Sequence, residues 1–166
     1  KQIVVKDCKL ALGKIASLWL LQWKELKRRK AHSTTDAKVI GITGSCGKTT
    51  VKEMLRAILV ESAKIIEGQK ADNSLSVLST QGNLNNEYGV PLTIMRLKAS
   101  HRLAIIEMGA NHQQEIAYLS SIARPDIAIV TNAGNAHVAG FGSLDGVAKG
   151  KGEIYSAMNQ DGIAII

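Results

Sequence analysis

The chain reads Val39-Ile40-Gly41-Ile42-Thr43 and then, without a break, Gly44-Ser45-Cys46-Gly47-Lys48-Thr49-Thr50. The first five residues show no alternation of polar and apolar positions, which is typical of a strand buried on both faces. An amphipathic helix is predicted directly after the loop, with apolar residues at i, i+3, i+4, i+7 and i+8: Val51, Met54, Leu55, Ile58 and Leu59. A strand, a glycine-rich loop and a helix in this order predict a phosphate-binding site in an α/β fold.

The loop has the residue types that a phosphate site needs. Gly44 and Gly47 lack side chains, so backbone N–H groups can approach phosphate oxygens. Lys48 supplies a positive charge, Thr49 supplies a hydroxyl for Mg²⁺, and the N-terminus of the helix faces the same anion. The strict pattern G-x-x-x-x-G-K-[ST] requires glycine at position 42, where this chain has Ile42 and offers Gly44 instead.

Further β-branched runs predict the rest of a sheet. They lie at Leu103–Ile106, Ile127–Val130 and Ile163–Ile166, and helical patterns separate them. Strands that alternate with helices imply a mostly parallel sheet flanked by helices, whose ligands bind at the carboxyl ends of the strands. Residues 1 to about 35 differ, and we expect a short strand there, then an amphipathic helix through Ile15, Leu18 and Trp19, and a polar connecting stretch at 32–36.

Composition narrows the function classes. The 166 residues are 45% hydrophobic and 21% charged, which indicates one packed domain. The net charge of +7 is concentrated in a run at 24–30, interpreted as a solvated helix end, and with 4% aromatic residues we expect no nucleic-acid partner. No apolar stretch is long enough for a membrane span. Cys8 and Cys46 have neither disulfide nor metal spacing, which favours free thiols and a cytoplasmic location.

Two residues that follow strands are metal-site candidates. Glu107 ends the run at 103–106, where a carboxylate near a phosphate loop can hold Mg²⁺, although a capping or ion-paired glutamate has the same spacing. His137 follows the run at 127–130, but imidazole is not the ligand that hard Mg²⁺ prefers, and a solvated loop histidine is an equal alternative.

Lys151 occupies an unusual helical position. The predicted apolar stripe of its helix consists of Leu144, Val147, Ile154, Tyr155 and Met158. At 100° per residue Lys151 falls within this stripe, while Lys149 and Glu153 are expected to point to water. A buried lysine must find an anion, extend its amine to the surface, or lose its charge. A neutral amine can also react with carbon dioxide to form an anionic carbamate.

Several motifs, in the right order, resemble the Mur ligase family of cell-wall peptide ligases. They are the loop at 43–50, where the family has T-G-[ST]-x-G-K-[ST]-[ST] and so accounts for Ile42, and the segments 82–93, 107–112, 136–143 and 151–155. The segments are most similar to family members that add D-alanyl-D-alanine to UDP-muramyl-tripeptide. The resemblance extends from about Ile3 to Ile166 and implies a P-loop NTPase-like central domain.

The resemblance also implies roles for single residues. The residues implied to contact ATP are Gly44, Ser45, Cys46, Gly47, Lys48, Thr49, Thr50 and Asn83. Mg²⁺ would be held by Thr49 and Glu107, with His137 and a carbamylated Lys151 also serving the metals. Asn85 and Asn86 would meet the muramyl precursor. Lys48, Lys151 and His137 are the implied catalytic residues.

Family members have three domains, so the resemblance implies a domain division for this chain. Residues 1–35 are expected to be the end of the N-terminal domain with a connecting segment, and residues 36–166 an incomplete central ATP-binding domain. The C-terminal domain is expected to be absent, so we interpret the chain as a truncated ligase, inactive alone and monomeric.

Two other functions remain open at this stage. A folylpolyglutamate synthase-like ligase would share the loop and the acyl-phosphate chemistry, although the asparagine-rich segment at 83–86 argues against it. A nucleotide-binding module that ligates nothing would need only the phosphate loop.

Overall fold

The computed structural model describes residues 2–30, 37–67 and 77–166. Its centre is a five-stranded sheet in the order β2-β3-β1-β4-β5, and every neighbouring pair is parallel. The strands are β1 (Lys38–Thr43), β2 (Val77–Ser79), β3 (Leu103–Glu107), β4 (Ile127–Val130) and β5 (Ile163–Ile165). The predicted parallel sheet is confirmed, and only the three-residue β2 was not predicted.

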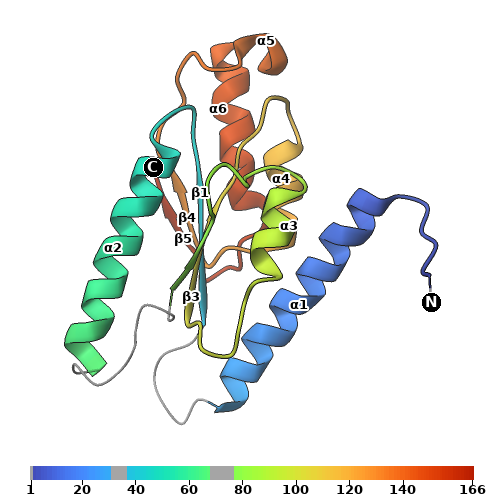
Figure 1. Ribbon diagram of the computed structural model, residues 1–166. Coiled ribbons are helices and arrows are strands. Elements are labelled where there is room, and N and C mark those ends of the chain that lie inside the picture. The colour runs from blue at the N-terminus through green and yellow to red at the C-terminus, as the bar shows by residue number, and fades with distance from the viewer. Residues whose placement is uncertain (1, 31–36, 68–76) are drawn as a thin grey trace.

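Helices cover both faces of the sheet (Figure 1). They are α1 (Cys8–Lys30), α2 (Lys48–Glu67), α3 (Gly89–Ile94), α4 (Glu115–Ala123), α5 (Val138–Phe141) and α6 (Leu144–Gly152), which continues into the 3-10 helix η2 (Glu153–Ala157). Helix α2 lies alone on one face, while α3, α4 and α6 lie on the other, and α1 forms an outer layer against α3 and α4. No helix in these described ranges is long and apolar enough to cross a membrane.

Helix α2 packs through a narrower stripe than the sequence predicted. Val51, Leu55 and Leu59 pack against the buried sheet residues Ile40 and Ile105. The other two predicted stripe residues, Met54 and Ile58, are 61% and 58% exposed, so the prediction was wrong for them. A helix contacts a sheet through one narrow face. Residues at the margin of a wide apolar stripe therefore remain exposed.

Helix α1 buries a different face from the one predicted. Ile15, Leu18 and Trp19 are 53%, 66% and 39% exposed. The buried residues are instead Ala16, Leu20 and Trp23, which belong to the main core with residues of α3 and α4. The helix is thus packed onto the domain rather than being a free connection.

Polar contacts fasten the end of α1 as well. The Trp23 indole N–H donates to the Lys98 carbonyl at 3.1 Å, and Lys24 pairs with Asp126 at 2.8 Å. Part of the basic run therefore holds α1 in place instead of being merely solvated. The short strand expected before α1 is not formed in residues 2–7, and the polar stretch 32–36, with the expected domain boundary, lies outside the described residues.

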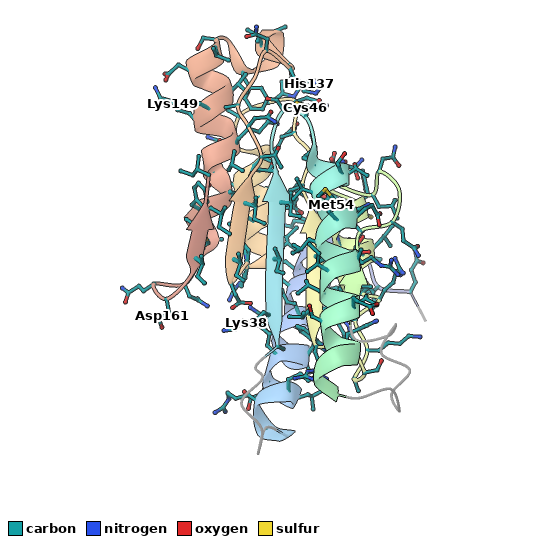
Figure 2. All side chains as sticks on the ribbon, turned by 90° about the vertical axis from the view of Figure 1, so that its left-hand side faces the viewer. Lys38, Cys46, Met54, His137, Lys149 and Asp161 are labelled. Carbon is teal, nitrogen blue, oxygen red and sulfur yellow. The ribbon has the colours of Figure 1, made fainter. Side chains whose placement is uncertain are left out.

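The parallel arrangement collects all carboxyl ends at one edge of the sheet. Figure 2 shows Cys46 and His137 beyond one end of the sheet, whereas Lys38, where β1 begins, and Asp161, which precedes β5, lie at its opposite end. The candidate residues that follow β1, β3 and β4 are thereby brought to a common edge.

Candidate functional site

The phosphate loop adopts a conformation that depends on its glycines. Gly44 and Gly47 have φ angles of 145° and 79°, values that residues with a Cβ rarely adopt. A Cβ on Gly44 would also collide with the Thr131 hydroxyl. The glycine at position 44 is therefore required twice, by backbone conformation and by the close approach of the loop after β4.

The first turn of α2 presents free donors to the loop. Val51 N–H donates to the Gly47 carbonyl at 2.9 Å, which is the first hydrogen bond of the helix ladder. The N–H groups of Lys48, Thr49 and Thr50 precede it and have no acceptor within the helix. Such a turn binds anions through these donors and through the helix dipole.

Asn132 holds the other half of the loop. Its carbonyl accepts from Ser45 N–H and its side-chain oxygen accepts from Cys46 N–H, both at 3.1 Å. Its amide in turn donates to the Cys46 carbonyl at 3.1 Å, where the Thr131 hydroxyl also donates at 2.6 Å. The amides of Ser45 and Cys46 are thus engaged within the protein, and the phosphate-facing donors begin at Gly47.

Asn132 was not a candidate in the sequence, although it is the second residue after β4, at the carboxyl edge of the sheet. That position was the available signal. Ser45 strengthens the same connection, because its hydroxyl exchanges hydrogen bonds with Gly134 N–H and the Gly134 carbonyl at 3.0 and 3.1 Å.

Lys48 folds back over its own loop. Its ammonium donates to the Gly44 carbonyl at 2.8 Å and approaches the Ser45 carbonyl at 3.4 Å. The side chain also lines a cleft in the surface of the domain. A ligand phosphate in this loop would lie between the Lys48 charge and the free amides of α2.

Glu107 and Thr49 are in direct contact. The Thr49 hydroxyl donates to Glu107 Oε2 at 3.0 Å, and the Asn85 amide donates to Oε1 at 2.9 Å. Glu107 is only 2% exposed, and its own N–H donates to the Thr80 hydroxyl at 2.9 Å. The structure thus brings together three residues that the sequence named as separate candidates.

A cleft of about 740 Å³ opens beside this pair. Candidate residues Lys48, Asn83, Asn85, Asn86 and His137 all line it. The remaining lining residues include Lys9 and Leu10 of α1, Glu87, segment 109–111, and Gln114, Glu115, Tyr118 and Leu119.

Of the cleft residues, Asn86 also has a local structural role, whereas His137 is exposed. The side-chain oxygen of Asn86 accepts from Gly89 N–H at 2.9 Å and from Tyr88 N–H at 3.2 Å, which fixes the start of α3. His137 is exposed, has a φ of 60° and precedes α5, so its ring is available to the cleft.

Lys151 is buried as its helical position predicted. It is 1% exposed, its ammonium donates to the Ala110 carbonyl at 3.2 Å, and it lies 5.0 Å from the centre of the Phe141 ring. Burial, and secondly the charge of Lys48, lowers the pKa of the Lys151 amine from 10.5 to about 8. The side chain therefore does not extend to the surface, and its amine loses the proton more easily than that of an exposed lysine.

The surroundings of Lys151 differ from the prediction at two points. Val147 and Ile154 are fully buried as expected, but Leu144 is 50% exposed. Glu153 does not simply face water, because its carboxylate accepts from Gln114 N–H at 2.7 Å and from Ala117 N–H at 3.1 Å. It thus satisfies donors at the start of α4, a tertiary role that helical spacing does not indicate.

The donor set suits Mg²⁺ better than a softer metal. Residues 2–30, 37–67 and 77–166 contain no group of three His, Cys, Asp or Glu side chains able to share a metal. Mg²⁺ is commonly held by one or two carboxylates together with substrate phosphates and water. Glu107 and the Thr49 hydroxyl beside a phosphate loop match that pattern.

Comparison with known proteins is consistent with this geometry. A family model described as the Mur ligase middle domain matches residues 42–166. The UDP-N-acetylmuramoyl-tripeptide--D-alanyl-D-alanine ligase of Haemophilus influenzae is 47% identical over 99% of this chain and 32% of its own length. The ligase of the same name from Escherichia coli is 46% identical over 99% of this chain and 31% of its own.

Solved structures agree with these relatives. A crystal structure of MurF from Acinetobacter baumannii superposes with a TM-score of 0.81 at 40% identity, over 99% of this chain and 31% of that one. The MurF ligase of Thermotoga maritima in complex with ADP gives a TM-score of 0.78 at 32% identity, over 99% and 33%. The chain therefore spans about a third of the length of the proteins it matches.

Proposed function

This chain belongs to the Mur ligase family, whose middle domain it carries, and we propose that it binds ATP and Mg²⁺ for the ligation of D-alanyl-D-alanine to UDP-N-acetylmuramoyl-tripeptide. The observation that carries the proposal is the contact between Thr49 and Glu107 at 3.0 Å beside the phosphate loop. Residues 36–166 would act as the central domain and residues 1–35 as the connection to an N-terminal domain.

The reaction would proceed in two steps. The terminal carboxylate of the tripeptide attacks the γ-phosphorus of ATP, which gives an acyl phosphate and releases ADP. The amine of D-alanyl-D-alanine then attacks the acyl carbon and forms the new C–N bond. The bond between the acyl carbon and the phosphate oxygen breaks, phosphate leaves with its electron pair, and the amine loses a proton. Neither step needs a covalent nucleophile from the protein.

The protein's part is positioning and electrostatic stabilisation. The amides of Gly47 to Thr50 and the Lys48 ammonium would hold the terminal phosphates, with Ser45 and Cys46 shaping the loop through Asn132. Thr49 and Glu107 would hold Mg²⁺, which neutralises charge on the phosphates when bound.

Other residues in and near the cleft would serve the second metal and the substrates. His137 lines the cleft, and a carbamate on Lys151 would replace a buried cation with an anion suited to Mg²⁺. Asn83 would contact the nucleotide, while Asn85 and Asn86 would meet the muramyl peptide. We propose a monomer that works in the cytoplasm.

The proposal is tested by measuring ADP release from the full-length ligase. ADP release should require UDP-muramyl-tripeptide, and continued turnover should also require D-alanyl-D-alanine. Lys48→Ala should abolish ADP release with unchanged circular dichroism, because the Lys48 ammonium donates its hydrogen bonds to carbonyls of its own loop. ADP release without the muramyl substrate would favour a nucleotide-binding module, and normal turnover of Lys48→Ala would refute the phosphate site.

A further inference from the structure

A second lysine, Lys52, is as deeply buried as Lys151. It is 1% exposed and lies on α2, one helical turn after Thr49. The nucleotide, metal and substrate contacts proposed above do not include it. A lysine is costly to bury without a partner, so its neighbours indicate its role.

The Lys52 ammonium joins three elements. It donates to the Thr80 carbonyl just after β2 at 2.9 Å, and lies 3.9 Å from Oε2 of Glu107 at the end of β3. Its third contact is with Oε1 of Glu53 at 3.0 Å, whose side chain is 55% exposed. Two contacts thus point inward to the metal-site end of the sheet and one points outward to solvent.

The inward contacts converge on Glu107. Thr80 receives the Lys52 ammonium on its carbonyl and the Glu107 N–H on its hydroxyl, at 2.9 Å each. The carboxylate oxygen near Lys52 is the one to which Thr49 donates. Thr80 therefore holds the Glu107 backbone, and Lys52 and Thr49 approach Oε2 of its carboxylate. Asn85 donates to the other carboxylate oxygen.

We propose that Lys52 is a positioning residue that holds the Glu107 carboxylate in place for Mg²⁺. It does so as a positive charge 3.9 Å from Glu107 Oε2, and its hydrogen bond to the Thr80 carbonyl at 2.9 Å constrains that distance. The inference rests on the proposed role of Glu107 as a metal ligand. Groups that orient a metal ligand in this way typically contribute about 10- to 100-fold to metal affinity.

The test compares variants of the full-length ligase. Lys52→Met removes the charge and the hydrogen bond, and Lys52→Gln keeps a donor of shorter reach without the charge. The matched control is Glu53→Gln, which removes only the outward partner. Two quantities are measured: the Mg²⁺ concentration for half-maximal ligation, and Mn²⁺ binding to the ADP-bound protein by electron paramagnetic resonance.

We expect Lys52→Met to raise the half-maximal Mg²⁺ concentration and the Mn²⁺ Kd about tenfold or more, with kcat at saturating Mg²⁺ reduced far less. Lys52→Gln should behave in the same direction, and Glu53→Gln should resemble the wild type. Should Lys52→Met fail to fold by circular dichroism, Lys52→Gln decides the question.

An unchanged or lower metal requirement in Lys52→Gln would overturn the inference, as would a loss of kcat without any change in Mn²⁺ binding. Glu107→Gln separates this failure from that of the proposed function. If Glu107→Gln leaves Mn²⁺ binding unchanged, the metal site itself is wrong; if it weakens binding while the Lys52 variants do not, only the role of Lys52 is wrong.

Discussion

Replacing Lys151 tests the proposed carbamate. Alanine and arginine variants distinguish a lysine that carries a carbamate for Mg²⁺ from a lysine that only contributes to helix packing. A carbamate forms when the neutral amine attacks carbon dioxide and loses a proton. Lys151→Ala removes the nucleophile, and Lys151→Arg keeps a positive charge that cannot be carbamylated in this way. Both should lose most ligase activity. A small carboxylate such as acetate should restore part of it in Lys151→Ala only, by filling the vacated space.

The structure gives the magnitude. With the pKa of Lys151 lowered to about 8, roughly a quarter of the amine is neutral at pH 7.5, against about one part in a thousand for an amine with a pKa near 10.5. Burial thus raises the reactive fraction by about two orders of magnitude. Since the folded pKa is depressed, the amine becomes protonated as the pH falls through about 8, and carbamylation should decline with it.

The assay is nuclear magnetic resonance of the full-length ligase in ¹³C-bicarbonate, with activity measured in parallel in buffers purged of carbon dioxide. Lys149 is the matched control, because it is 74% exposed and pairs with Asp145 on the same helix. Lys149→Arg should keep both the labelled carbamate and the activity. Near-normal activity of Lys151→Arg, or a carbamate signal that survives in Lys151→Ala, would refute the reasoning.

Three other perturbations probe the phosphate loop and the domain. Gly44→Ala should lose about 2 to 4 kcal/mol of stability in urea denaturation and should not bind ADP, because its φ is 145° and a Cβ would strike the Thr131 hydroxyl. Gly152→Ala, where a Cβ meets nothing, serves as its control. Asn132→Ala removes the two hydrogen bonds of its side chain to Cys46 and should weaken ADP binding about tenfold in calorimetry, in accord with hydrogen bonds worth about 1 kcal/mol each; unchanged affinity would show that Asn132 does not hold the loop for the nucleotide. Residues 1–166 alone should neither ligate D-alanyl-D-alanine nor bind ATP tightly, since domain closure commonly completes such sites; full activity in a coupled phosphate assay would show otherwise.

The parts of the fold that the sequence predicted are those with short-range causes. The buried strands β1, β3, β4 and β5 follow from uninterrupted β-branched runs, and the phosphate loop follows from two glycines and a lysine between a strand and a helix. The burial of Lys151 was also predictable, because helical periodicity places it among apolar neighbours. The same reasoning applied to α2 would have shown Lys52 next to Leu59 around the helix, at the flank of the apolar stripe.

Other features depend on which surfaces meet. In α1 two apolar faces compete, and packing against α3 and α4 selects the one with the smaller Ala16 rather than Ile15 and Leu18. Glu153 was expected to face water because helical spacing places it away from the apolar stripe. The N–H groups of α4, distant in sequence, decide its actual position.

The sequence by itself thus determined the parallel α/β class, the phosphate loop, the positions of Glu107 and His137 after their strands, and the place of Lys151 on the apolar face of its helix. Only the tertiary structure decided how Glu107 is shared among Thr49, Asn85 and Lys52, and how Asn132 engages the loop amides. The physical reason is that backbone periodicity and conformation are set within a few residues. Hydrogen bonds and ion pairs between strand ends instead depend on distances across the sheet, which exist only after the chain has folded.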